Sequence, residues 1–157
     1  MTVEPIKVLL IEDNIGDYEL IIRMLDNSEN AKFELTHTQK LGSGLELLKS
    51  NKFDIILLDL GLPDCDGLNS FKIIFKNYNT IPIIILTGLA NEEIGIKSIK
   101  YGAQDYLVKG EFNGKLLVRT IQYAIERKKI EGLFVYWSNF ISISILKLIF
   151  RFKYQNL

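Results

Sequence analysis

The chain has 157 residues, which suits one domain of ordinary size with its own hydrophobic core. Hydrophobic residues make up 48% of it, which excludes a largely disordered protein. Basic and acidic residues balance at 19 each, so we expect no nucleic-acid partner. The single cysteine, Cys65, excludes an internal disulfide and a multi-cysteine metal site.

The first third of the chain predicts two strand–helix pairs. Residues before Lys7 are few and mixed in charge, unlike a signal peptide, so we expect a cytoplasmic protein. The apolar run Lys7–Ile11 predicts a strand, and helical spacing predicts a helix over Ile15–Asn27 with Asp17 as its cap. A shorter strand over Phe33–Thr38 and a helix from Leu41 to near residue 51 follow.

The central strand is predicted over Ile55–Leu58, four unbroken aliphatic residues that run into Asp59. A short run without alternation is typical of a strand buried on both faces of a parallel sheet. Burying a lone carboxylate there would cost roughly several kcal/mol, so Asp59 must lie in a cleft with partners. A loop rich in Gly, Pro and Asp over residues 61–67 follows, and then a helix marked by Leu68, Phe71, Ile74 and Phe75.

Two further strand–helix pairs complete the pattern. A strand over Ile83–Leu86 ends on Thr87, and a helix follows from Asn91 to about residue 101. We expect Ile94 and Ile99 to face inward on this helix. A strand over residues 105–108 ends on Lys109, and the last helix runs to about residue 129, with its inner face formed by Leu117, Ile121, Ala124 and Ile125.

Strict alternation of five strands with five helices predicts an α/β fold. We expect a parallel sheet with helices on both faces, joined by right-handed crossovers. The expected sheet is doubly wound and flavodoxin-like with strand order 2-1-3-4-5, an order that rests on analogy with folds of this type because the spacing alone does not set it.

The segment after residue 130 differs from the rest. We assign residues 1–130 to the α/β domain and residues 131–157 to an apolar C-terminal tail. The uncharged run from Leu133 to Leu146 is shorter than the roughly 20 residues of a spanning helix. A marginal membrane anchor, an amphipathic or sticky helix and the remnant of a longer protein remain as interpretations. The abrupt change in composition at Gly132 favours the remnant.

Polar residues end four of the predicted strands: Glu12 and Asp13, then Asp59, Thr87 and Lys109. Because all carboxyl ends of a parallel sheet lie at one edge, we expect these side chains to meet. Three carboxylates repel one another unless a cation lies among them, and an all-oxygen site suits Mg²⁺. An ammonium and a hydroxyl beside it can hold a phosphoryl group, for which Asp59 can be the acceptor.

Four segments then resemble the receiver domains of two-component response regulators. They are Leu10–Asn14, Leu57–Gly67, Ile85–Gly88 and Gly102–Lys109. The resemblance extends from about residue 6 to residue 129, and the combination of segments at these strand ends is specific.

The resemblance implies a role for each strand-end residue. Asp59 would accept a phosphoryl group from a histidine kinase or a phosphotransfer protein, with Mg²⁺ as cofactor. Asp13 would bind the metal directly, Glu12 would bind it through water, and the backbone carbonyl of Gly61 would be a further ligand. Thr87 and Lys109 would contact the phosphoryl group.

The resemblance also implies a conformational output. Tyr106 would be the switch aromatic, turning inward as Thr87 moves toward the phosphoryl group. The face formed by the fourth helix, fifth strand and fifth helix would then change partners, and two copies could pair through it. Gly110 stands where the family usually has a proline, often with a cis bond, which puts the geometry around Lys109 in question.

Two other functions compete with this interpretation. A Mg²⁺-dependent phosphatase would need a second acid two positions after Asp59, where this chain has Gly61. A scaffold without phosphorylation is disfavoured because all five site positions are filled. We therefore expect a signalling phosphoacceptor that catalyses only its own phosphorylation and dephosphorylation, not an enzyme. The sole histidine, His37, is expected to be structural or exposed.

Overall fold

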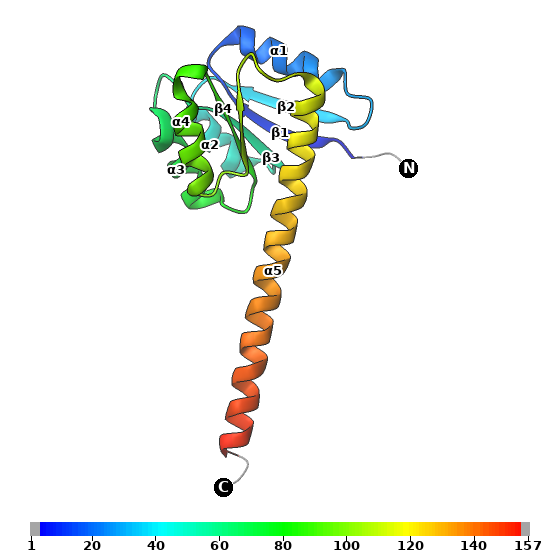
Figure 1. Ribbon diagram of the computed structural model, residues 1–157, viewed down its shortest axis with the longest axis vertical. Coiled ribbons are helices and arrows are strands. Elements are labelled where there is room, and N and C mark those ends of the chain that lie inside the picture. The colour runs from blue at the N-terminus through cyan, green and yellow to red at the C-terminus, as the bar shows by residue number, and fades with distance from the viewer. Residues whose placement is uncertain (1–3, 155–157) are drawn as a thin grey trace.

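Five parallel strands form the centre of the molecule in the computed structural model, which describes residues 4–154 (Figure 1). Their order is β2-β1-β3-β4-β5, as expected. The strands are β1 (Ile6–Ile11), β2 (Phe33–Thr38), β3 (Ile55–Asp59), β4 (Ile83–Thr87) and β5 (Asp105–Val108).

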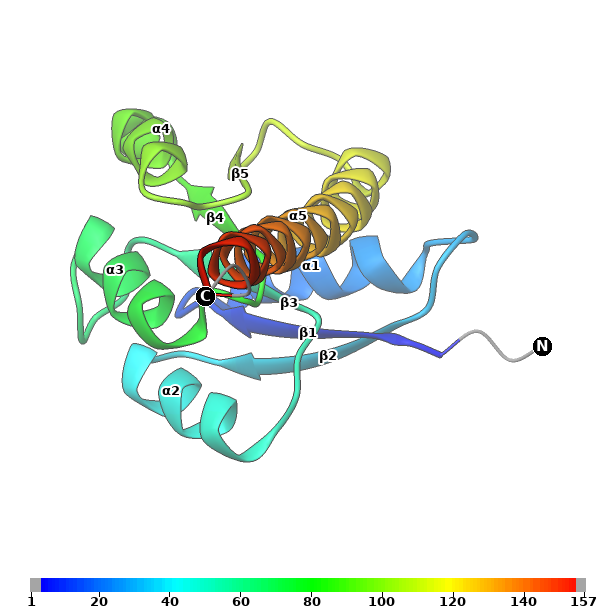
Figure 2. The ribbon, with the colours of Figure 1, turned by 90° about the horizontal axis from the view of Figure 1, so that it is seen from below.

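Helices cover both faces of this sheet. They are α1 (Ile15–Asp26), α2 (Leu41–Ser50), α3 (Gly67–Tyr78), α4 (Glu92–Lys100) and α5 (Gly114–Tyr154), with a short 3-10 turn, η1, over Leu89–Asn91. Figure 2 shows α1 and α5 on one side of the strands and α2 and α3 on the other. The predicted doubly wound α/β fold is confirmed.

The aliphatic strands divide the core into two layers because successive side chains point to opposite faces. In β3, Ile55 and Leu57 pack in the layer beneath α1 and α5, while Ile56 and Leu58 pack in the layer with α2 and α3. All five residues of β3 are buried. Each such aliphatic side chain contributes about 1.5–3 kcal/mol on burial, so the unbroken apolar run is what makes this strand central.

The cap of α1 is Asn14, and the prediction of Asp17 is wrong. Asn14 Oδ1 accepts a hydrogen bond from the backbone N–H of Asp17 at 3.1 Å. A cap residue precedes the first turn and accepts from N–H groups within it. Asp17 lies in that first turn, so its own N–H is one of the groups to be satisfied.

The inner face of α4 also differs from the expectation. Ile94 is half-buried as predicted, but Ile99 is 38% exposed, and the fully buried residues of the helix are Gly95 and Ser98. A Cβ atom added to Gly95 would lie 3.1 Å from the ring of Tyr106. The aromatic ring occupies the space between α4 and the sheet, so the helix can approach only with small residues.

The last helix does not end near residue 129 but continues to Tyr154 (Figure 1). Gly132 does not stop it, since one glycine inside a helix costs only about 1 kcal/mol relative to alanine. The pairs Lys128–Glu131 (3.0 Å) and Lys129–Glu126 (2.9 Å) support the turns just before it. The composition changes at Gly132, but the backbone is helical on both sides of it. Residues 155–157 of the predicted tail lie outside the described residues.

Candidate functional site

The ends of the strands bring the predicted site residues together at one edge of the sheet. Asp59 ends β3 and Thr87 ends β4, while Glu12 directly follows β1 and Lys109 directly follows β5. The backbone N–H of Lys109 donates to the carbonyl of Thr87 at 2.8 Å, so the hydrogen bonding between β4 and β5 extends to these two site residues. Glu12, Asp59 and Thr87 are buried, and Asp13 is exposed.

Glu12, Asp13 and Asp59 form a carboxylate cluster. One oxygen atom from each lies within 4.8 Å of the others. Burial of Glu12 and Asp59 and exposure of Asp13 leave the cluster open on one side, where water can complete a coordination shell. A hard divalent cation that takes oxygen ligands and retains water, such as Mg²⁺, fits this donor set.

Lys109 supplies the positive charge that the cluster needs. Its Nζ lies 2.6 Å from Glu12 Oε2 and 3.0 Å from Asp59 Oδ1. Burial opposes the charge of this ammonium, but contacts with Glu12, Asp17 and Asp59 outweigh it and raise the pKa of Lys109 above its ordinary value. The ammonium therefore stays charged and reduces the repulsion between the two buried carboxylates.

Asp17 is a member of the site that the sequence analysis missed. Its Oδ2 lies 2.9 Å from Lys109 Nζ, so three carboxylates share one ammonium. With Asn14 as the cap, Asp17 falls in the first turn of α1, which starts at the edge of the sheet. No local pattern could have predicted this contact, because it depends on where α1 begins relative to the sheet edge.

Glu12 carries the strongest carboxyl shift of the site. Burial is the main cause and the charge of Asp59 adds to it, raising the pKa of Glu12 to about 7. Contact with Lys109 and a 3.0 Å hydrogen bond from the N–H of Asn14 act in the opposite direction. A nearby divalent cation would favour the charged form of this group.

Thr87 and Tyr106 lie next to each other beneath α4. A Cβ atom at Gly95 would be 3.1 Å from the Tyr106 ring and 3.4 Å from the Thr87 methyl group, so both side chains border the same small space. The Thr87 hydroxyl donates to the carbonyl of Gly88 at 3.1 Å. The Tyr106 hydroxyl donates outward to Glu92 at 3.2 Å.

Two glycines lie next to site residues, Gly61 two positions after Asp59 and Gly110 directly after Lys109. A Cβ atom at Gly61 would lie 3.2 Å from Asp59 Oδ2, so any other residue here would crowd that oxygen. Gly110 has a φ of 85°, which proline cannot adopt, and the described residues contain no cis peptide. With Gly110 after it, Lys109 contacts the carboxylates of Glu12 and Asp59.

His37 contacts the backbone of a site residue, Glu12. Its Nε2 lies 2.7 Å from the carbonyl oxygen of Glu12, which only accepts, so Nε2 carries the proton. Its ring stacks on Tyr18 with centroids 4.1 Å apart. These contacts agree with the structural role expected for this residue.

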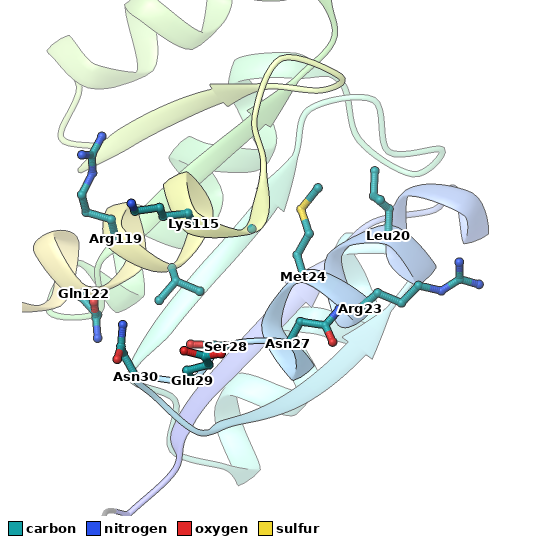
Figure 3. Close-up of a pocket in the computed structure, with 12 residues that line it drawn as sticks. Leu20, Arg23, Met24, Asn27, Ser28, Glu29, Asn30, Lys115, Arg119 and Gln122 are labelled. Carbon is teal, nitrogen blue, oxygen red and sulfur yellow. The ribbon is translucent and has the colours of Figure 1, made fainter.

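A surface pocket of about 700 Å³ lies elsewhere, between α1 and α5 (Figure 3). Arg23 from α1 and Lys115 and Arg119 from α5 give its rim positive charge. None of the five strand-end residues lines it. The carboxylate cluster at the sheet edge is therefore separate from this pocket.

Comparison with known proteins identifies the family. A sequence model described as response regulator receiver domain matches residues 8–122. The cell cycle response regulator CtrA of Brucella ovis is 34% identical over 123 residues, which is 78% of this chain and 51% of CtrA. CtrA of Brucella anthropi gives the same values. The chain thus spans about half the length of these curated relatives.

Solved structures agree with this result. A response regulator receiver domain protein from Clostridium thermocellum is 28% identical, has a TM-score of 0.70, and is matched over 80% of this chain and 98% of its own. A CheY-like receiver from Methanospirillum hungatei, at 23% identity, shows the same fold with a TM-score of 0.70 over 82% of this chain and 100% of its own. The residues that the family model matches include all five strand-end residues. The chain therefore belongs to the response regulator receiver domain family of two-component signalling.

Proposed function

We propose that this chain is a phosphoacceptor that takes a phosphoryl group on Asp59 from a phosphohistidine of a histidine kinase or phosphotransfer protein. The observation that carries the proposal is the meeting of Asp59, Lys109 and two further carboxylates at one sheet edge. A carboxylate oxygen of Asp59 attacks phosphorus, the bond from phosphorus to the donor imidazole nitrogen breaks, and that nitrogen takes up a proton.

The two oxygens of Asp59 have different surroundings, which suits this chemistry. Oδ1 is held by the Lys109 ammonium at 3.0 Å, which fixes the orientation of the carboxylate. Oδ2 lies beside Gly61, where the Cβ atom of any other residue would crowd it at 3.2 Å. We assign Oδ2 as the attacking atom, and Thr87 and Lys109 as the groups that contact the transferred phosphoryl oxygens.

We assign Mg²⁺ to the cluster of Glu12, Asp13 and Asp59, with Asp13 as a direct ligand, Glu12 acting through water and the carbonyl of Gly61 as a further ligand. The ion would neutralise charge that develops on the phosphoryl oxygens. Lys109 alone cannot do so while three carboxylates share it.

The output that we propose is a population shift at the α4–β5–α5 face. Thr87 and Tyr106 border one space under Gly95, so movement of Thr87 toward a phosphoryl group would make room for the Tyr106 ring. Turning inward would break the hydrogen bond from Tyr106 to Glu92 and change the exposed surface of α4. Two copies could also pair through this face. The receiver would lie in the cytoplasm, and its balanced charge favours no nucleic-acid contact of its own.

Incubation with acetyl phosphate and Mg²⁺, followed by intact mass spectrometry, tests the acceptor. We expect one phosphoryl group on the wild-type chain and none on Asp59→Asn. Asp54→Asn is the matched control, because Asp54 lies just before the opposite end of β3 and accepts a hydrogen bond only from the N–H of Lys7 among the described contacts. Equal labelling of wild type and Asp59→Asn would contradict the assignment.

A Mg²⁺-dependent phosphatase remains the alternative with related chemistry. The structure supports it less, because the position two residues after Asp59 is Gly61, whose missing side chain offers no second acid. Continuous release of phosphate from a phosphate ester, faster than the decay of the phosphorylated protein, would favour the phosphatase.

A further inference from the structure

The part of α5 beyond Glu131 exposes large apolar side chains along its length. Between Leu133 and Ile149 their exposed fractions run from 50% for Ile145 to 76% for Phe134. Among the described side chains from Glu131 to Ile149, only Ser144 is half-buried. Soluble monomeric proteins rarely expose a contiguous apolar surface of more than a few hundred Å². This surface therefore needs a partner.

The apolar residues surround the helix instead of forming a stripe. The consecutive residues Leu133 to Trp137 are all exposed, and at about 100° per residue they cover every side of the helix. A second copy in a coiled coil would cover only one seam. A helix that is apolar all round belongs in the interior of a large protein or in a bilayer, and only a bilayer covers every side at once without a specific partner.

The length and flanking charges of this segment suit a bilayer. At about 1.5 Å per residue, the helix from Gly132 to Ile149 is roughly 27 Å long, close to the hydrocarbon core of about 30 Å. Lys128 and Lys129 precede it, and Lys147 lies near its far end, from where a long side chain can reach the interface. None of the corresponding apolar window is buried against the described part of the chain, unlike a typical core helix, and the window follows a folded domain, unlike a signal sequence.

One hydroxyl and two aromatic rings of the segment are placed as a lipid environment favours. The Ser142 hydroxyl donates to the carbonyl of Ser138 at 2.9 Å, so it is satisfied within the helix. Tyr136 and Trp137, which contact each other edge-on at 6.0 Å, lie near the receiver end. Such rings favour the boundary between headgroups and hydrocarbon.

We propose that α5 from Gly132 to Ile149 inserts into a lipid bilayer and holds the receiver domain at the membrane surface. Arg127 links the receiver to the base of this helix, with an ion pair to Asp105 at 3.5 Å and a hydrogen bond to the carbonyl of Gln104 at 3.0 Å. The proposal is independent of phosphorylation at Asp59. It concerns where the receiver is placed and not what it does.

The test is synthesis of the full chain in a cell-free system with vesicles of phosphatidylcholine and phosphatidylglycerol. We expect the wild-type chain to float with the vesicles and to resist extraction with alkaline carbonate. Ile141→Arg, near the middle of the segment, should lower the vesicle-bound to free ratio about a hundredfold. Ile73→Arg is the matched control, because Ile73 is 41% exposed on α3, and it should float like the wild type.

Three results would overturn the proposal. A wild-type chain that stays soluble as an oligomer would show that copies of the helix cover one another. A chain that carbonate removes from the vesicles would be adsorbed and not inserted. Equal flotation of Ile141→Arg and the wild type would show that the segment is not in the hydrocarbon core.

Discussion

At the scale of single residues, the site depends on one ammonium shared by three carboxylates. The strand-end rule predicted Glu12, Asp59 and Lys109 as neighbours, because it depends only on the direction of the strands. It could not predict Asp17, since that contact depends on where α1 begins and thus on Asn14 as the cap. Nor could it show that Lys109 is engaged by carboxylates before any phosphoryl group arrives.

Lys109→Met should destabilise the protein in the absence of Mg²⁺, because it leaves the buried carboxylates of Glu12 and Asp59 without a cation. We expect the free energy of unfolding to fall by about 2 kcal/mol in urea titrations, less than for a fully buried pair since the Lys109 side chain is 21% exposed. Millimolar Mg²⁺ should recover more stability in this variant than in the wild type. Lys97→Met on the exposed surface of α4 is the control, and equal stability of the two variants would refute this role.

At the scale of elements, the loop after Asp59 stabilises the start of α2. The residue before α2, Lys40, makes no side-chain cap. Instead Asp64 Oδ1 accepts from the N–H of Leu41 at 2.9 Å and Oδ2 accepts from the N–H of Gly42 at 3.0 Å. The sequence indicated both the loop and the helix, but a cap supplied from 23 residues away has no local pattern.

Asp64→Ala should lower the free energy of unfolding by about 1 kcal/mol at neutral pH. The N–H group of Gly42, and then that of Leu41, hold the pKa of Asp64 below its usual value. A lowered pKa in the folded state stabilises the protein above the unfolded value of about 3.9, and this stabilisation is lost as pH falls through the folded value. The difference between wild type and variant in urea titrations should therefore shrink below about pH 4.

Asp66→Ala provides the comparison, since Asp66 is exposed in the same loop and its carboxylate accepts from the Asn69 side chain. A difference for Asp64→Ala that stays constant from pH 7 to pH 3 would show that the carboxylate does not act as the cap.

The packing of the helices on the sheet explains the remaining differences between expectation and structure. Helical periodicity located the five α-helices, because apolar faces must pack on the sheet. It misjudged Ile99, since the position of α4 is set by the bulk of Tyr106 against Gly95. It also ended α5 too early, because a helix that leaves the protein body no longer needs an apolar stripe.

At the scale of the whole molecule, α5 belongs to two environments. Its first turns bury Leu117, Ile121 and Ala124 in the core, and its second half extends away from the body (Figure 1). A chain that ends after Glu131 should therefore keep the receiver folded, with a melting temperature within a few degrees of the full chain, as expected from the small effect of exposed sites.

Adding Leu117→Ala to this short chain should lower its free energy of unfolding by about 2–5 kcal/mol. An unfolded short chain would mean that the receiver needs the extension.

The most direct measurement locates the phosphoryl group itself. The full chain is treated with acetyl phosphate and Mg²⁺, the acyl phosphate is reduced with borohydride, and tandem mass spectrometry of peptides finds the altered residue. We predict modification at Asp59 alone. The modified fraction should depend on Mg²⁺ and should be smaller in Asp13→Asn than in the wild type. Modification at another residue, or none under conditions in which the protein is folded, would contradict the assignment of this site.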